Sequence, residues 1–291
     1  MRIDELIRQA SLSLESISDS PRLDAEVLLA HVLQKSRGFL YAHPEYQLTD
    51  TELALWQTFI TKRQQSVPIA YLIGEREFWS LSFYVSTATL IPRPATESLV
   101  SYLLNRYPNT PLSICDLGTG TGAIAISLAH ERPQWHVTAV DIQPQAIALA
   151  KKNAERHQTL IHFICSNWFE QIPLSTFDII VSNPPYIAPD DPHLFMGDVQ
   201  HEPRTALVSA QQGLADIEYL LDHAAIHLNP NGILIFEHGY DQQPQILALM
   251  QAKGWKNPQG FNDEEGIPRF CVGHQSTIPN IDNDGIINNS F

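Results

Sequence analysis

The chain has 291 residues, of which 44% are hydrophobic, and this predicts one large domain or two smaller ones with a substantial core. With 18 Lys and Arg against 32 Asp and Glu, the formal net charge is −14, which argues against binding of duplex DNA through long-range attraction to phosphates. No segment reaches the roughly 20 apolar residues of a membrane span, so we expect a soluble, cytoplasmic protein. Cys115, Cys165 and Cys271 are expected to be buried free thiols, and no C-x-x-C or H-E-x-x-H spacing predicts a metal site.

The first part of the chain, residues 1–75, has helical periodicity. Apolar residues at helical spacing near the N-terminus predict an amphipathic helix and not a signal peptide. SPRLDAEVLLAHVLQ, residues 20–34, begins with a candidate N-cap at Ser20 followed by proline, and residues 50–65 form another predicted helix. We therefore expect residues 1–75 to form a small helical domain.

Beyond this domain, residues 76–95 are predicted to form a hairpin or linker, and a helix follows at about residues 96–107. Strands and helices then alternate, with strands that are apolar on both faces, as in parallel sheets covered by helices. Strands are predicted at 112–117, 136–141, 161–165, 177–182 and 232–239, and helices at 122–131, 144–155, 213–228 and 244–254. The pattern predicts a doubly wound α/β domain at residues 96–274, with RFCVGH as an antiparallel edge strand and residues 275–291 as a disordered tail.

A glycine-rich loop, DLGTGTG, follows the first of these strands. Such a loop lets a ligand lie against bare backbone at the carboxyl end of the sheet. Asp141 ends the next strand, 19 positions after the last glycine, where a carboxylate can accept hydrogen bonds from both ribose hydroxyls of an adenosine. The G-x-G-x-G spacing differs from the G-x-G-x-x-G of dinucleotide loops, so the pair predicts a nucleoside cofactor of another kind. The predicted loop residues are Gly118, Thr119, Gly120, Thr121 and Gly122.

The segment SNWF follows the third strand. Trp168 is predicted to stack on an adenine face, although a purely structural core position remains open, and Asn167 is placed to reach the base edge.

The turn SNPPYIAPD follows the fourth strand, at the edge of the sheet where ligands bind. The side-chain oxygen of Asn183 is an acceptor, and the prolines stiffen the turn so that the Pro184 carbonyl is held as a second acceptor. Two converging acceptors suit a planar NH₂ group, and Tyr186 adds a flat surface for the substrate. Holding both N–H bonds aims the nitrogen's π face at an electrophile bound beside the turn and stabilises the positive charge that develops on nitrogen. Asn183, Pro184 and Tyr186 are therefore the predicted catalytic residues, and Pro185 completes the predicted substrate-binding turn.

The D-L-G-x-G-x-G loop resembles the first motif of S-adenosylmethionine methyltransferases, and N-P-P-Y resembles their amino-group class. From residue 20 to about 273 the chain is similar to the HemK-type protein-glutamine methyltransferases, in segments that include SPRLDAEVLLAHVL, LIPRP, VSNPPYI, GLADI and EHG. This resemblance implies methylation of the Gly-Gly-Gln glutamine of peptide chain release factors, with a helical domain that helps to grip the release factor. It also implies that the glycine loop, Asp141, Trp168 and Asn183 contact S-adenosylmethionine. Separately, we expect a monomer.

The chain departs from this family at two positions, where Ala95 and Asn167 replace acidic residues. Ala95 weakens the cofactor pocket if the acid shapes its wall, or costs about 1 kcal/mol if the acid caps the next helix. Three alternatives stay open: a ribosomal-protein glutamine methyltransferase, a DNA adenine methyltransferase, and a protein that binds the cofactor without catalysis. The DNA enzyme would need a recognition domain and a basic face, which the first 75 residues do not supply.

Overall fold

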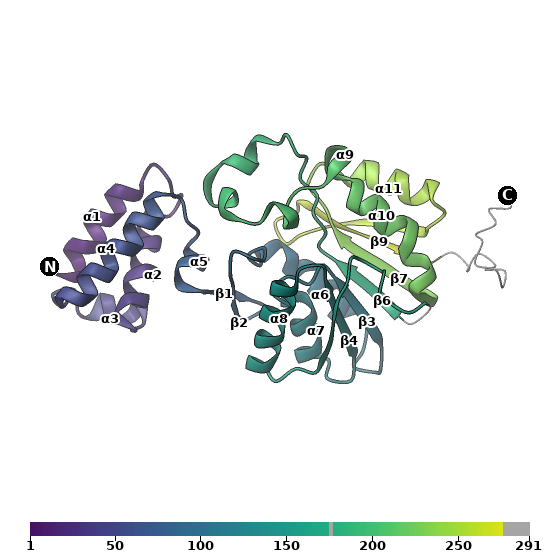
Figure 1. The fold of residues 1–291 in the computed structure, drawn as a ribbon, viewed down its shortest axis with the longest axis horizontal. Coiled ribbons are helices and arrows are strands. Elements are labelled where there is room, and N and C mark those ends of the chain that lie inside the picture. Colours follow the sequence, from purple (N-terminus) through teal and green to yellow (C-terminus); the bar gives the residue numbers. More distant parts are fainter. Residues whose placement is uncertain (175–176, 276–291) are drawn as a thin grey trace. The chain divides into compact units, whose positions relative to one another are not determined.

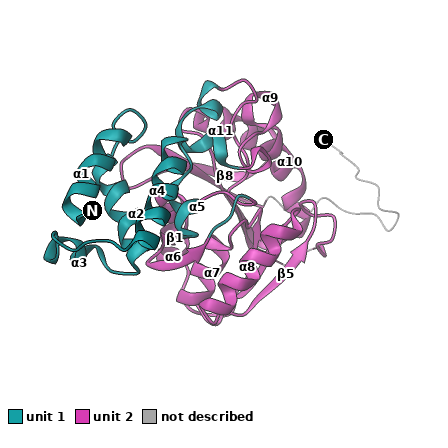
Figure 2. Ribbon diagram, turned by 60° about the vertical axis from the view of Figure 1, so that its left-hand side comes forward, with its two compact units in different colours: residues 1–75, 85–87, 192–202 teal, residues 76–84, 88–191, 203–291 magenta. Residues whose placement is uncertain are grey.

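The computed structural model describes residues 1–174 and 177–275 and divides the chain into two compact units (Figures 1 and 2). Unit 1 contains residues 1–75, 85–87 and 192–202, and unit 2 contains the rest of the described chain. Gln275, the first residue of the predicted tail, is buried and donates to the Ala225 carbonyl, while residues 276–291 lie outside the described residues. None of the helices in the described ranges is long and apolar enough to cross a membrane.

Unit 1 contains the helices that the periodicity predicts, together with two short ones that it missed. They are α1 (Ile3–Leu14), α2 (Pro21–Leu33), α3 (Arg37–Ala42), α4 (Asp50–Gln64) and α5 (Ile69–Ile73). A capping box starts α4, in which Thr49 Oγ1 accepts from the Glu52 N–H and Glu52 Oε2 accepts from the Thr49 N–H. Ser20 occupies the N-cap position of α2, as predicted, but its side chain makes no capping hydrogen bond.

A segment from far along the sequence, residues 192–202, also belongs to unit 1. It carries two short 3₁₀ helices, η2 (Pro192–Phe195) and η3 (Gly197–His201). Arg63, at the end of α4 and almost fully buried, bonds to Asp24 Oδ2 at 2.8 Å and to Asp198 Oδ1 at 2.5 Å. The buried guanidinium is thereby paired on both sides, and the pairing ties the segment to the helical core.

Unit 2 is a doubly wound domain around a mostly parallel seven-stranded sheet, as predicted. The strand order is β5-β4-β3-β6-β7-β9-β8, and all pairs from β5 to β7 are parallel. The strands are β3 (Ser113–Leu117), β4 (His136–Asp141), β5 (Ile161–Cys165), β6 (Phe177–Ser182), β7 (Leu228–Glu237), β8 (Lys256–Asn262) and β9 (Pro268–His274). A separate two-stranded hairpin of β1 (Glu75–Phe78) and β2 (Leu81–Tyr84) lies where the aromatic segment predicted one.

Helices cover both faces of the sheet, which explains why its strands are apolar throughout. On β7, Ile233 and Ile235 belong to one buried cluster, while Leu234 and Phe236 belong to the other. The first cluster is covered by α6 (Glu97–Arg106), α7 (Ala123–Glu131) and α8 (Pro144–Arg156), and the second by α10 (Ala215–His223) and α11 (Gln243–Ala252), as Figure 1 shows.

Three predictions in this domain need correction. The single helix expected at residues 213–228 does not begin at Gly213, which has φ +86° and ends α9 (Ala210–Gly213); α10 begins at Ala215, and the 3₁₀ helix η5 (Ala224–His227) follows it. The strand RFCVGH is antiparallel but not at the edge, because β8 pairs with its outer side. Cys165 is exposed at the end of β5, whereas Cys115 and Cys271 are buried.

Candidate active site

The glycine loop joins β3 to α7 at the carboxyl edge of the sheet. Gly118, Gly120 and Gly122 have φ values of +72°, +55° and +83°, a backbone region that other residues rarely adopt. The N–H groups of Gly118 and Thr119 both donate to the Val140 carbonyl at 2.9 Å, which fixes the loop against β4. A Cβ at Gly122 would lie 2.7 Å from a side chain of α7, so this glycine serves helix packing, whereas Gly118 and Gly120 present bare backbone.

Asp141 ends β4 directly beside this loop. Its Oδ2 accepts from the Gly120 N–H and its Oδ1 from the Gln143 N–H, both at 2.9 Å. Burial raises the pKa of the carboxyl, while these backbone donors act in the opposite direction. Each oxygen keeps a further lone pair, so the fixed carboxylate can still accept from a bound diol.

Asp116 supports the loop from behind and was not predicted as a site residue. Its Oδ2 accepts from Thr119 Oγ1 at 2.7 Å and from the Ala125 N–H at 3.2 Å. Complete burial raises the pKa of this carboxyl to about 7, against the effect of those two hydrogen bonds. A carboxylate inside an otherwise apolar strand was the available sequence signal.

Trp168 has φ +45° and lines the same cavity as the glycine loop and Asp141. It is half-buried, and its ring lies 6.3 Å from that of Tyr219 on α10. Trp168 therefore contacts both the hydrophobic core and this cavity. The Nδ2 of its exposed neighbour Asn167 donates to Glu170 Oε1 at 2.7 Å.

The N-P-P-Y turn follows β6, and Ser182 Oγ anchors its start by donating to the Leu117 carbonyl at 2.8 Å. Asn183 is half-buried, and its Nδ2 donates to Thr96 Oγ1 at 3.3 Å. Tyr186 packs against the hydrophobic core, and its hydroxyl donates to Glu237 Oε1 at 3.2 Å. Burial together with the Glu237 charge raises the pKa of Tyr186 far above its usual value, so the phenol stays protonated.

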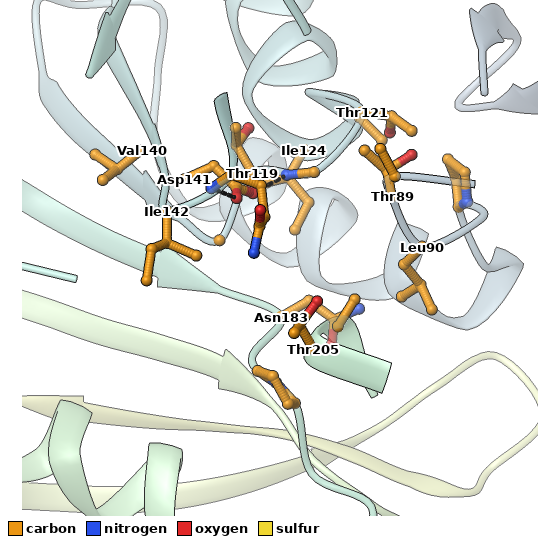
Figure 3. A pocket seen from close by; sticks show the side chains of 18 of the residues that line it. Thr89, Leu90, Thr119, Thr121, Ile124, Val140, Asp141, Ile142, Asn183 and Thr205 are labelled. Atoms are coloured by element: carbon orange, nitrogen blue, oxygen red, sulfur yellow. Dashed lines mark hydrogen bonds between the residues drawn. The ribbon is translucent and has the colours of Figure 1, made fainter. Parts of the chain in front are cut away.

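These elements enclose a cavity of about 400 Å³, within the size range of small-molecule sites. Figure 3 shows Asp141 and Thr119 on one side and Asn183 and Thr205 on the other. The predicted residues that line it are Gly118, Thr119, Gly120, Thr121, Asp141, Asn167, Trp168, Asn183 and Pro185. Gly122, Pro184 and Tyr186 are not among its lining residues; Gly122 and Pro184 lie behind the surface, and the Tyr186 ring packs into the core.

The prediction missed other parts of this cavity. Thr89 and Leu90, within the stretch predicted as a hairpin or linker, line it (Figure 3). Thr96 is another of its lining residues. Glu237, at the end of β7, bonds to both Thr96 and Tyr186. The available signals for Glu237 were a charged residue that follows the apolar run GILIF and its place in the EHG segment of the family resemblance. Ala95 is not among the lining residues, and its carbonyl accepts from Ser98 Oγ at the start of α6.

Two family models match the chain. The PrmC N-terminal domain matches residues 5–74, and the methyltransferase small domain matches residues 93–198. The first match covers the helices α1–α5, and the second covers the glycine loop, Asp141 and the N-P-P-Y turn.

Curated relatives match nearly the whole chain. The release factor glutamine methyltransferase of Salmonella typhimurium is 48% identical over 88% of this chain and 93% of its own length. The protein of the same name from Escherichia coli is 44% identical over 94% of this chain and 99% of its own length. Two solved structures are similar in fold. A methyltransferase from Pyrococcus furiosus matches with a TM-score of 0.54 and 18% identity, over 75% of this chain and 100% of its own. A 16S rRNA methyltransferase of T. thermophilus, in complex with AdoMet and guanosine, matches with a TM-score of 0.51 and 18% identity, over 69% of this chain and 50% of its own. At these identities the two structures support the methyltransferase fold alone.

Proposed function

This chain belongs to the family of release factor glutamine methyltransferases, and from that premise we infer that it transfers a methyl group from S-adenosylmethionine to a glutamine side-chain amide nitrogen in peptide chain release factors. The acceptor is the glutamine of their Gly-Gly-Gln motif. The observation that carries this proposal is the placement of Asn183 at the wall of a cavity that the glycine loop and Asp141 also line.

The cavity fits the nucleoside part of S-adenosylmethionine. Gly118 and Gly120 form a cradle in which added Cβ atoms would lie 4.0 Å from Trp168 and Thr89, both of which also line the cavity. Asp141 is already oriented by two backbone donors and would hold the ribose hydroxyls, and Trp168 would pack against the adenine. When bound, S-adenosylmethionine supplies an electrophilic methyl group.

The N-P-P-Y turn positions the acceptor. Because Asn183 Nδ2 is committed to Thr96, we propose that its Oδ1 accepts one N–H of the substrate amide. The Pro184 carbonyl is the proposed acceptor of the other N–H, although Pro184 is not among the residues that line the cavity. An amide nitrogen is a poor nucleophile, since its lone pair is delocalised into the carbonyl. Fixing both N–H bonds orients the nitrogen for attack and stabilises its developing positive charge.

We propose that the helices of residues 1–75 bind the release factor, because the PrmC N-terminal domain model matches them. The net charge of −14 favours a protein substrate over DNA. We further propose that the protein acts as a monomer in the cytoplasm, where translation terminates. A ribosomal-protein glutamine substrate is the nearest alternative, since the cavity chemistry would be the same.

Methyl transfer tests the proposal directly. Incubation with radiolabelled S-adenosylmethionine should label a purified release factor and leave unlabelled a variant factor whose Gly-Gly-Gln glutamine is changed to Ala. Isolated ribosomal proteins serve as the competing substrate. Label on the Ala variant, or preferential label on a ribosomal protein, would overturn the substrate assignment.

Asp141→Ala is expected to weaken S-adenosylmethionine binding by about 10- to 100-fold, because hydrogen bonds to a charged group contribute about 1.5–3 kcal/mol. Isothermal titration calorimetry measures this change. Asp178→Ala is the matched control: Asp178 also accepts a backbone N–H, from Ser113, but it lies at the start of β6, and the opposite end of that strand leads into the N-P-P-Y turn. Equal affinities of the Asp141 variant and the unmodified protein would refute the ribose role.

A further inference from the structure

Behind Asn183 lies a buried chain of hydrogen bonds that joins distant parts of the sequence. Thr96 is 4% exposed and Glu237 is 1% exposed. Thr96 Oγ1 donates to Glu237 Oε2 at 2.6 Å, and Asn183 Nδ2 donates to Thr96 Oγ1 at 3.3 Å. The other carboxylate oxygen of Glu237 accepts from the Tyr186 hydroxyl at 3.2 Å. Both polar side chains of the N-P-P-Y turn are therefore connected to Glu237.

The donors and acceptors permit only one direction for these hydrogen bonds, from Asn183 through Thr96 to Glu237. An ionised carboxylate can only accept, so the single hydroxyl proton of Thr96 is directed to Glu237. The Thr96 oxygen is then left with lone pairs toward Asn183, and only the NH₂ end of that amide can donate to it. The Asn183 oxygen must consequently point away from Thr96.

Several groups around Glu237 favour the ionised form that this direction requires, and they act against the effect of burial. Burial raises the pKa of its carboxyl, while the hydrogen bond from Thr96 and the positive charges of Arg269 and Arg93 work in favour of the ionised form. The Tyr186 hydroxyl needs an acceptor in its half-buried setting, and within the described part of the chain its one hydrogen-bond partner is Glu237.

An asparagine amide has nearly the same shape in its two flipped orientations, so packing alone selects poorly between them. The flipped orientation would place the Asn183 NH₂ against the NH₂ of a substrate amide, with donors facing donors. We propose that Glu237 and Thr96 are positioning residues that lock the Asn183 amide with its oxygen toward the substrate nitrogen. This inference rests on the proposed function, because it concerns how the acceptor amide is recognised.

Thr96 variants test the lock first. Thr96→Val keeps the shape but removes the acceptor, and kcat for release factor methylation is expected to fall by about 100-fold, a loss typical of a misplaced reacting group. Thr96→Ser keeps the hydroxyl and should stay within threefold of the unmodified enzyme. Ser98→Ala, which removes another hydroxyl bond at the start of α6, is the matched control and should also keep its activity. A Thr96→Val enzyme as active as Thr96→Ser would overturn the proposal.

The Glu237→Gln variant reverses the direction of the hydrogen bond between residues 96 and 237, and this distinguishes a positioning role from a purely structural one. In Glu237→Gln the new amide oxygen can accept from Tyr186 while its NH₂ donates to Thr96, so the Thr96 proton turns toward Asn183 and flips that amide. The expected loss in kcat is again about 100-fold. Adding Asn183→Asp supplies a carboxylate that accepts from Thr96 with one oxygen and faces the substrate with the other.

The double variant Glu237→Gln/Asn183→Asp is therefore expected to be at least tenfold more active than either single variant. If the losses in kcat of the two single variants instead multiply in the double variant, Glu237 and Thr96 do not fix the orientation of the Asn183 amide. Measured S-adenosylmethionine affinity should stay within threefold for Glu237→Gln, so a collapse of cofactor binding in that variant would also count against a positioning role. An unmodified enzyme that leaves release factors unlabelled would instead refute the proposed function, which keeps the two failures distinct.

Discussion

Asn183→Ala is expected to lower the rate of methyl transfer by about 1,000-fold while leaving S-adenosylmethionine affinity within threefold. The side-chain oxygen of Asn183 is the acceptor that orients the substrate amide, and loss of one group that stabilises developing charge typically costs 100- to 1,000-fold in kcat. The glycine loop and Asp141, which hold the cofactor in our proposal, are bonded to each other and not to Asn183. Single-turnover kinetics with bound cofactor measures the chemical step, and calorimetry measures the affinity.

The control for this variant is Asn105→Ala. Asn105 is an exposed residue of α6 whose Nδ2 donates to Ser101 Oγ, and it is not among the residues that line the cavity, so its replacement removes the same group away from the site. We expect its transfer rate to equal that of the unmodified enzyme. Normal turnover by the Asn183 variant would refute the role that we assign to its side chain.

Gly213→Ala is expected to lower kcat by about 100-fold, although Gly213 is not one of the residues that line the cavity. Its φ is +86°, and an added Cβ would lie 2.1 Å from the Tyr186 carbonyl oxygen and 2.8 Å from Gln242 Nε2. Gln242 Nε2 donates to that same carbonyl at 3.0 Å. The backbone of the N-P-P-Y turn must therefore move before any side chain fits at residue 213. Steady-state kinetics and thermal unfolding together measure the effect.

Gly266→Ala separates this clash from simple backbone strain. Gly266 has φ +80°, close to that of Gly213, but an added Cβ would meet nothing within 4 Å. Its replacement should cost about 1 kcal/mol in the free energy of unfolding and leave kcat unchanged. If the two variants lose the same activity, the contact between Gly213 and Tyr186 does not position the turn.

The parts of the fold that could be predicted from the sequence are those determined by local pattern. The parallel strands are continuous apolar runs because helices cover both faces, and the loop glycines and Asp141 follow strands at fixed spacing. By contrast, β8 has the sequence KNPQGFN, in which Pro, Gly and polar residues all disfavour strands. Its pairing with β9 produces the strand, so tertiary contact overrides propensity there.

The residues of the candidate site likewise include some that the sequence pattern predicts and others that depend on tertiary contacts. The glycine loop, Asp141 and Asn183 follow strands that end at one edge of a sheet, so sequence order alone brings them together. Thr96 and Glu237 are 141 positions apart, and no spacing rule links a residue before α6 to the last residue of β7. Arg63 and Asp198 are another pair of this kind, since their contact depends on a long segment that folds back onto helices. Such side-chain networks are formed only by the complete fold.

The central claim is that a glutamine side-chain nitrogen receives the methyl group. Fragment-ion mass spectrometry of a release factor, digested after incubation with the enzyme and S-adenosylmethionine, locates that group most directly. We predict one added methyl group on the side-chain amide of the Gly-Gly-Gln glutamine, present with the unmodified enzyme and lacking with Asn183→Ala. A methyl group on any other residue, or one that persists at the same level with the Asn183 variant, would contradict the account.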